Sequence, residues 1–252
     1  MNETLKVLND LHTTHGNFTD KEIDDLTLKS ILETSVRGAN ASNRQSYSII
    51  VIRGKEKTEK ITGYGAPVAL LVCVDFNRLY DIGEQLGYPS DYDNLFNYFT
   101  AHTDAIIVAQ TAVIAASSLG VGSLITNSIH NSFRRNLDDI YKELDLPNEH
   151  FFPVTAILLG YEDKAPEHKK GRLTDTGIVH YDKYNRLTSK QKDELIETIN
   201  DPSQNFGDKG DCDNYLEFYY TKWAAPKSKE TASQMDSMLI EKMKSFLHEL
   251  YA

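Results

Sequence analysis

The chain has 252 residues, of which 25% are charged, and its formal net charge is −10. That length can bury a full core, and the charged fraction is ordinary for a soluble globular protein of one large domain or one domain with an appendage. The acidic balance argues against a nucleic-acid partner, because phosphate backbones are bound by dense basic faces. Two cysteines are too few for a disulfide framework and the N-terminus lacks a secretory signal pattern, so we expect a cytoplasmic protein.

The first predicted helix begins at Thr19-Asp20-Lys21-Glu22, where a Thr followed three residues later by a Glu forms a capping-box pattern. Apolar residues continue at helical spacing, and the pattern ends near Gly38. A polar turn over residues 40–45 then leads into the first predicted strand.

Four apolar runs predict a sheet. Continuous apolar residues at Tyr47–Ile52 and Val68–Val74 predict central strands that are covered on both faces. Ser123–Thr126 predicts a short strand, and the apolar run Phe152–Leu159 predicts a last strand that is buried on both faces.

Helical patterns lie between and after these strands. Residues 103–119 are apolar on every side, which predicts a helix buried all round; polar residues interrupt the run and flanking cations are lacking, so we expect no membrane span. Residues 79–102 are rich in aromatic residues and predict a variable helical insert that could form a lid over a flat ligand. Phe133–Leu146 predicts an amphipathic helix.

The texture changes after Tyr184. Helical patterns cover Ser189–Ile199, Tyr215–Trp223 and Lys229–Tyr251, and a turn-rich stretch over residues 201–210 is the best candidate for a linker. We therefore expect a core over residues 1–199 and a helical extension over residues 200–252, which packs on the core or on a partner subunit.

A cluster of cations follows the last predicted strand. His168-Lys169-Lys170-Gly171-Arg172 lies on a short turn after a polar loop. An Arg fork and a Lys point charge together suit a phosphate group. The alternative is an ordinary solvated basic loop, because single motif matches carry a real false-positive risk.

Several segments in the same order resemble flavin-dependent nitroreductases, in their larger, NADPH-preferring branch. The segments are Val74–Leu79, Asp104–Gly122, Ile129–Ser132, Lys170-Gly171-Arg172 and Tyr219–Trp223. The resemblance implies an α+β fold, in which a mixed, mainly antiparallel sheet is flanked by helices and followed by a C-terminal helical extension. It also implies FMN as cofactor, NADPH or NADH as co-substrate, and a homodimer with the flavin at the subunit interface. Lys170 and Arg172 would then hold the FMN phosphate, with Lys169 as the adjacent alternative to Lys170.

The polar turn before the first strand matches the segment that meets the ring edge of the flavin in this family. We expect Asn40, Ala41, Ser42, Asn43 and Gln45 to bind there, because small residues permit close backbone approach and amide or hydroxyl groups match ring donors and acceptors. The alternative is an ordinary Asn/Ser turn, which is common before a strand.

The end of the third predicted strand is the second expected ring contact. The resemblance implies that a backbone N–H among Thr126, Asn127 and Ser128 points at the flavin N5 atom. The same residues can equally form a strand-to-helix turn with Asn131 or Ser132 as N-cap, and both interpretations can hold together.

The N-terminus departs from the family pattern of Arg-x-Ser-x-Arg or Lys. His12 lies at the place of the first Arg and Thr14 at the place of the Ser, so both can still donate hydrogen bonds to phosphate. Gly16 lies at the place of the second cation and cannot replace it, which would destabilise the reduced flavin anion. His15, Arg37 or Arg44 could supply this charge from another direction.

The predicted activity is NAD(P)H-dependent, FMN-dependent reduction of a small-molecule acceptor such as a nitroaromatic or a quinone. Hydride passes through the flavin N5 atom, and the nicotinamide leaves before the acceptor binds. The histidines show no metal-ligand spacing, so we expect no metal, and no separate Rossmann motif is present. Alternatives are a flavin-binding or storage protein with little turnover, a specialised flavoenzyme such as a dehalogenase, and a structural dimer without cofactor.

Overall fold

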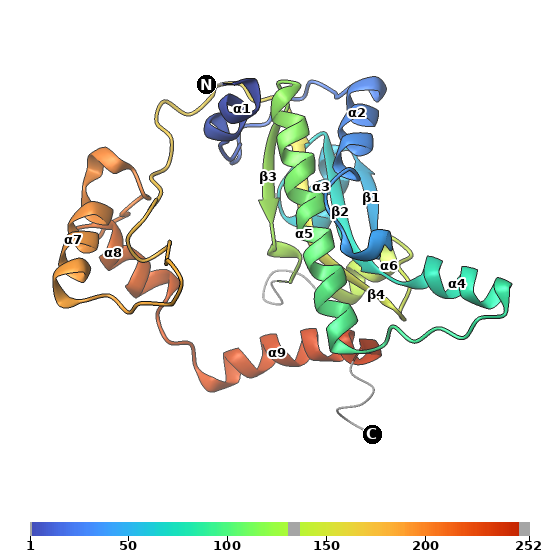
Figure 1. The fold of residues 1–252 in the computed structure, drawn as a ribbon. Helices are drawn as coiled ribbons and strands as arrows, with labels where there is room; N and C mark the ends of the chain where they lie inside the picture. Colours follow the sequence, from blue (N-terminus) through green and yellow to red (C-terminus); the bar gives the residue numbers. More distant parts are fainter. Residues whose placement is uncertain (1, 131–136, 247–252) are drawn as a thin grey trace. The chain divides into compact units, whose positions relative to one another are not determined.

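The computed structural model describes residues 2–130 and 137–246 (Figure 1). The chain divides into two compact units, one of residues 1–165 with 230–252 and the other of residues 166–229. We expected a core over residues 1–199 and an extension over residues 200–252 from the resemblance to a family's core domain. The two compact units do not test that division, so it stays a prediction.

The first unit is built on a four-stranded sheet in the order β1-β2-β4-β3. Its strands are β1 (Tyr47–Arg53), β2 (Val68–Asp75), β3 (Gly122–Thr126) and β4 (Phe151–Gly160). All three pairings between these strands are antiparallel. The four predicted strands and the α+β class are confirmed, and the described pairings include no parallel one, although a mixed sheet was expected.

The two middle strands are buried along their length, as their continuous apolar runs predict. Every residue of β4, and every residue of β2 except Asp75, is buried. The prediction that β1 is also central was wrong, because β1 forms one edge of the described sheet and Val51 is 37% exposed. A run of β-branched residues fits an edge strand as well as a central one, so apolarity alone did not place it.

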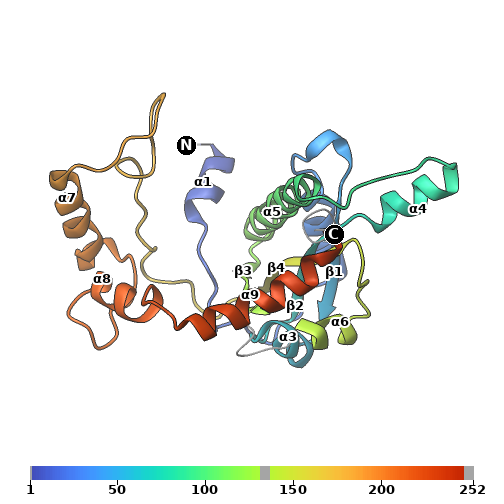
Figure 2. The ribbon, with the colours of Figure 1, turned by 90° about the horizontal axis from the view of Figure 1, so that it is seen from below.

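Helices cover both faces of the sheet. Helices α2 (Asp25–Ser35) and α5 (Leu95–Ser118) pack on one face, against Leu70, Val72 and Val154. Helices α3 (Lys55–Thr62) and α6 (Leu137–Glu143) pack on the other, against Leu71 and Leu158. Figure 2 shows α5 on one side of the strands and α3 with α6 on the other. The alternation of neighbouring residues between the two clusters follows from the pleat of a strand.

Helix α2 begins later than its sequence pattern predicted. The capping box at Thr19–Glu22 was wrong, because the backbone N–H and the hydroxyl of Thr19 both donate to the carbonyl oxygen of Tyr161, at 2.8 and 3.0 Å. The carboxylate of Asp24 caps the helix instead and accepts from the N–H of Thr27 at 2.9 Å. Residues 18–19 instead run beside the chain that leaves β4, where Phe18 and Glu162 form an antiparallel bridge.

Helix α5 is longer and less buried than predicted. It begins at Leu95 rather than Thr103, so it takes in the last part of the aromatic insert, whose first part lies in α4 (Asn77–Leu86). The helix is not buried all round, because Phe96, Phe99 and Ile106 are 78, 61 and 42% exposed. Among the described residues α5 is long and apolar enough to cross a membrane, but half of its most apolar window is buried, as in the core helix of a soluble fold.

The aromatic residues of the insert lie in different environments, and their role as a lid stays a prediction. Tyr98 is 5% exposed and packs against Phe152 and Phe246 in the core. Tyr92 stacks on Phe76, with ring centroids 5.2 Å apart. The remaining aromatic residues of the insert are exposed to different degrees, so the uniform aromatic pattern of the sequence covers several environments.

Shorter elements complete the described chain. Helix α6 matches the second half of the predicted helix Phe133–Leu146, whose residues 133–136 lie outside the described residues. The remaining elements are α1 (Glu3–Asp10), α7 (Ser189–Asn200), α8 (Tyr215–Phe218), a π-helix (Tyr219–Trp223), α9 (Lys229–Met243) and four single-turn 3₁₀ helices (Ala41–Asn43, Ser128–His130, Pro202–Gln204, Lys244–Phe246). Phe246, after α9, is fully buried against Phe76 and Tyr98, so the chain returns to the first unit at that point.

Candidate functional site

The turn ahead of β1 has a strained backbone. Ser42, Asn43 and Gln45 have φ angles of 53, 54 and 53°. Left-handed backbone is uncommon outside glycine, and strain of this kind gathers at binding sites where the surrounding structure enforces it. Three such residues among four consecutive positions distinguish this turn from an ordinary Asn/Ser turn.

Side chains from two helices hold this turn in place. The carboxylate of Asp104, on α5, accepts two contacts from the N–H of Ala41, at 3.0 and 3.2 Å. The guanidinium of Arg78, on α4, donates to the carbonyl oxygens of Arg44 and Gln45 at 3.1 and 2.5 Å. Within the turn, the side-chain oxygen of Asn40 accepts from the N–H of Gln45 at 3.3 Å.

Asp104 is a buried carboxylate, only 3% exposed, in an otherwise apolar part of α5. Burial raises the pKa of this carboxyl, and the N–H of Ala41 and the charge of Arg44 oppose that rise. The sequence analysis missed Asp104 and Arg78 as site residues. A single carboxylate inside an apolar helix was the available signal, because a buried charge needs a partner.

Unsatisfied polar atoms lie at the end of the turn and at the start of β1. Among the described residues, the Nε atom of Arg44, the hydroxyl of Ser46 and the hydroxyl of Tyr47 are buried without a hydrogen-bond partner. Burial raises the pKa of Tyr47, and the neighbouring charge of Asp104 adds to this effect. Buried polar groups are normally satisfied, so three exceptions in four residues fit a segment that a polar-edged ligand completes.

The second expected ring contact lies at the end of β3. The side-chain oxygen of Thr126 accepts from the N–H of Ser128 at 3.1 Å, and Asn127 is exposed. The hydroxyl of Ser128 donates to the carbonyl oxygen of Thr62, on α3. The turn is therefore pinned to the sheet and to α3 while Asn127 faces solvent, and its role toward a flavin stays a prediction.

The structure brings His12 and Thr14 together around a third residue, Glu162. The Nε2 atom of His12 lies 2.8 and 3.0 Å from the two carboxylate oxygens of Glu162. The hydroxyl of Thr14 donates to the same carboxylate at 3.1 Å. Sequence analysis missed Glu162, because a lone Glu after a strand carries no recognisable signal.

Gly16 lies where the family pattern has its second cation, and the structure shows its backbone conformation. Gly16 has a φ angle of 81°, and a Cβ atom there would meet no atom within 4 Å. Space is therefore open, but the backbone favours glycine. Of the three alternative cations, His15 packs edge-on against Tyr64 and Arg44 donates to Asn97 at 2.9 Å, whereas Arg37 is exposed with no side-chain partner among the described residues.

In the second unit, Lys170 and Arg172 flank a glycine that the turn requires. A Cβ atom at Gly171 would lie 2.4 Å from the carbonyl oxygen of Gln204. The ammonium of Lys170 donates to the side-chain oxygen of Asn205 at 3.3 Å, and Arg172 donates to the carbonyl oxygen of Gly171 at 2.8 Å. Both side chains are exposed, and among the described residues neither is paired with a carboxylate.

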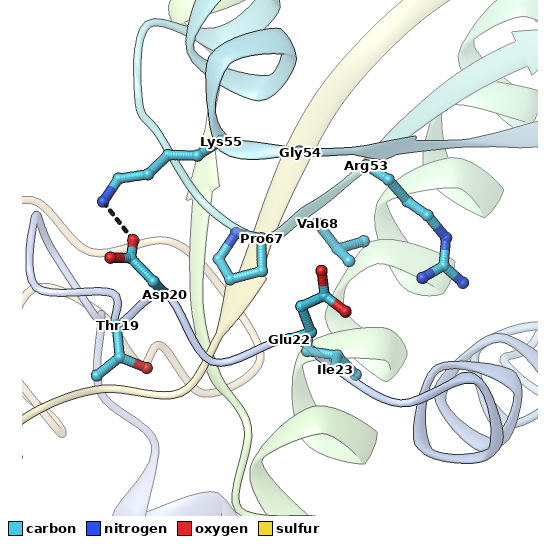
Figure 3. Close-up of a pocket in the computed structure, with 9 residues that line it drawn as sticks. All are labelled: Thr19, Asp20, Glu22, Ile23, Arg53, Gly54, Lys55, Pro67 and Val68. Carbon is cyan, nitrogen blue, oxygen red and sulfur yellow. Dashed lines mark hydrogen bonds and ion pairs between the residues drawn. The ribbon is translucent and has the colours of Figure 1, made fainter.

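A pocket of about 260 Å³ lies elsewhere, beside the ends of β1 and β2 (Figure 3). Its cation Lys55 already pairs with Asp20 at 2.9 Å, and Arg53 pairs with Asp25 at 2.6 Å. None of the predicted site residues lines it. Because its cations are neutralised by carboxylates, this pocket does not offer a phosphate site.

Comparison with known proteins identifies the family. Residues 60–161 match the model of the nitroreductase family. An FMN reductase [NAD(P)H] from Bacillus subtilis is 30% identical over 195 residues, which cover 73% of this chain and 75% of that protein. A Cr(VI) reductase from Pseudomonas is 26% identical over 94% of this chain and 90% of its own length. The structure of NfrA2 from B. megaterium matches with a TM-score of 0.78 and 26% identity, over 94% of this chain and 98% of that one.

The chain belongs to the nitroreductase family. The family predicted from the ordered segments and the α+β class are thereby confirmed. The assignment of individual residues to a flavin site is a separate matter and stays a prediction.

Replacing Ser42 with Gly tests the strain in the turn. We expect the free energy of unfolding to rise by about 0.5–1 kcal/mol, because relief of left-handed strain exceeds the entropy that glycine adds to the unfolded chain. Urea denaturation measures the change. Ser42→Ala, which keeps the Cβ atom, is the control and should give no gain. Equal effects of the two substitutions would mean that this residue is not strained.

Proposed function

We propose that this chain binds FMN and oxidises NADPH or NADH to reduce a small-molecule acceptor such as a nitroaromatic or a quinone. The single observation that carries the proposal is the turn of residues 40–47, which combines enforced strain with unsatisfied buried polar atoms. The names of the relatives, an FMN reductase [NAD(P)H] and a Cr(VI) reductase, agree with this chemistry and extend the candidate acceptors to chromate.

A bound flavin would supply the hydride-accepting and electron-donating atoms, and the chain would supply position and electrostatics. Asn40, Ala41, Ser42, Asn43 and Gln45 would hold the ring edge. Asp104 and Arg78 would support flavin binding without contacting the ring, because they fix the backbone of the turn that would contact it. A turn that is already in its binding conformation loses little further entropy on binding.

Lys170 and Arg172 would hold the phosphate. They lie two residues apart on one loop, exposed and not paired with a carboxylate among the described residues. Asn205, which itself has a positive φ of 50°, fixes this turn by donating to the carbonyl oxygens of His168 and Lys169, both at 3.2 Å. The two cations are therefore held on an ordered turn and are free to bind an anion.

A homodimer would cover the exposed stripe of α5. Phe96, Phe99, Thr103, Ile106 and Gln110 are all exposed and recur every three or four residues, so they lie on one face of the helix. Large apolar side chains in such a stripe are the usual sign of a partner helix. A second copy of this chain is the simplest partner, and the reducing cytoplasm is the compartment that the two free cysteines favour.

The rival function is a flavin carrier with little turnover. Gly16 favours it, because no cation stands at that position and the positive φ of 81° disfavours any other residue. A fixed charge there would stabilise a reduced flavin. Arg37 is the cation that remains free to take this role among the described alternatives, and it is exposed on the chain that leaves α2.

Anaerobic reduction of the FMN-loaded protein separates the two functions. We expect NADPH or NADH to bleach the flavin absorbance and a quinone or nitroarene to restore it, because an oxidoreductase must complete both halves of the cycle. Stopped-flow absorbance records each half separately. Flavin bands that persist after excess NADPH and NADH would support the carrier and contradict turnover.

Replacing Lys170 and Arg172 together with Gln tests the phosphate anchor. We expect the dissociation constant of FMN to rise about 30- to 100-fold, because two charge-assisted hydrogen bonds are lost, while that of riboflavin changes less than about twofold. Quenching of flavin fluorescence measures both. Lys183→Gln with Arg186→Gln removes the same charge from exposed positions of the same unit and should leave FMN affinity unchanged. A similar loss in that control would reduce the anchor to a general charge effect.

Replacing Phe99 with Asp tests the proposed dimer. We expect the protein to become monomeric at micromolar concentration, since a buried unpaired carboxylate costs several kcal/mol at an interface. Analytical ultracentrifugation gives the mass. Leu86→Asp, at a site on α4 that is 63% exposed against 61% for Phe99, is the matched control and should stay dimeric. A wild-type protein that is already monomeric would refute the dimer.

A further inference from the structure

Glu162 brings a negative charge to the place where the core of this protein is expected to receive a phosphate. Its carboxylate contacts His12 and Thr14 at once, at 2.8 and 3.1 Å. The two side chains of the His12–Glu162 pair are only 27 and 19% exposed, so the pair is partly withdrawn from water. These contacts use the Nε2 atom of His12 and the hydroxyl proton of Thr14.

The backbone holds Glu162 beside the N-terminal segment. Phe18 and Glu162 form an antiparallel bridge, and the N–H of Asp163 donates to the carbonyl oxygen of Asn17 at 3.2 Å. The segment that carries Glu162 is therefore tied on both sides of that residue to the N-terminal segment.

Thr14 is fixed just as firmly. Its N–H donates to the carbonyl oxygen of Ser123 at 2.8 Å, and its side chain is 1% exposed. A Cβ atom at Gly122 would lie 2.4 Å from the Thr14 hydroxyl oxygen, so β3 approaches Thr14 closely only because residue 122 is glycine.

The two pairs of candidate phosphate ligands differ in whether a carboxylate already contacts them. Lys170 and Arg172 are exposed and unpaired with any carboxylate among the described residues. His12 and Thr14 are engaged by a carboxylate, which is negatively charged like the phosphate that they are expected to bind. A phosphate that reaches His12 and Thr14 must either displace Glu162 or share them with it, and both cost free energy.

We propose that Glu162 is a selectivity residue that competes with the 5′-phosphate of a flavin for His12 and Thr14. This inference rests on the proposed binding of FMN. Glu162 weakens the binding of flavins that carry a phosphate and leaves flavins without one unaffected. The N-terminal segment then opposes a preference for FMN over riboflavin, so any such preference comes from other groups.

Titration of the flavin-free full chain with FMN and with riboflavin tests this role. Glu162→Gln keeps the size of the side chain and its ability to accept from Thr14, but removes the charge. We expect FMN to bind about tenfold more tightly to this variant, while the affinity for riboflavin changes less than about twofold. Glu162→Ala should change FMN affinity in the same direction without contributing an amide. Riboflavin reports in each case that the site is intact.

Glu143→Gln is the matched control. Glu143 pairs with Lys60 at 2.6 Å on the surface, so this substitution removes one negative charge without touching His12 or Thr14. We expect both flavins to bind it as they bind the wild type. An FMN affinity that is unchanged in Glu162→Gln, or that moves together with riboflavin affinity, would overturn the role of Glu162 while leaving the proposed function intact. Failure of the wild type and of every variant to bind either flavin would refute the proposed function, and this inference with it.

Discussion

The contact between the Asp104 carboxylate and the Ala41 N–H is the constraint on which the candidate site depends. It joins the strained turn to α5, and α5 packs against both β2 and β4. The turn therefore takes its position from the central strands rather than from its own sequence. Without an outside partner, three left-handed residues would relax, because each costs free energy that local contacts do not repay. A buried carboxylate suits this task, since moving away from its N–H partner would leave a charge unpaired in the core.

The candidate ligand groups of the two units differ in whether they are already paired with a carboxylate. In the first unit, His12 and Thr14 are already engaged by Glu162, and Arg44 donates to Asn97 although its Nε atom has no partner. In the second unit, Lys170 and Arg172 remain open. The second unit therefore offers free cations to an anionic group, whereas the first unit offers a turn with a preformed backbone conformation.

The positions of the strands were predicted from the sequence more accurately than the burial of their residues and of the helices. All four strands appear at the predicted places, because continuous apolar runs bounded by turns leave few alternatives. The burial of β1 and of α5 was overestimated, since an apolar face on an edge strand or on the exposed side of a helix has the same composition as one in the core. The predicted capping box at Thr19–Glu22 was wrong for a related reason. Its sequence permits a cap, but Thr19 donates instead to the carbonyl oxygen of Tyr161, just after β4.

Candidate site residues could be predicted from the sequence only where residue type and spacing form a recognisable pattern. Lys170, Arg172 and the Asn/Ser turn carry such signals, and the structure describes each of them on an ordered turn. Asp104, Arg78 and Glu162 act through tertiary contacts with residues 33 to 150 positions away, which no local pattern encodes. Their common property is a charge placed beside backbone or polar groups that it alone can satisfy. The same physical rule therefore makes Asp104 a support for the turn and Glu162 a rival of the phosphate, and only the neighbour of each carboxylate decides which role it has.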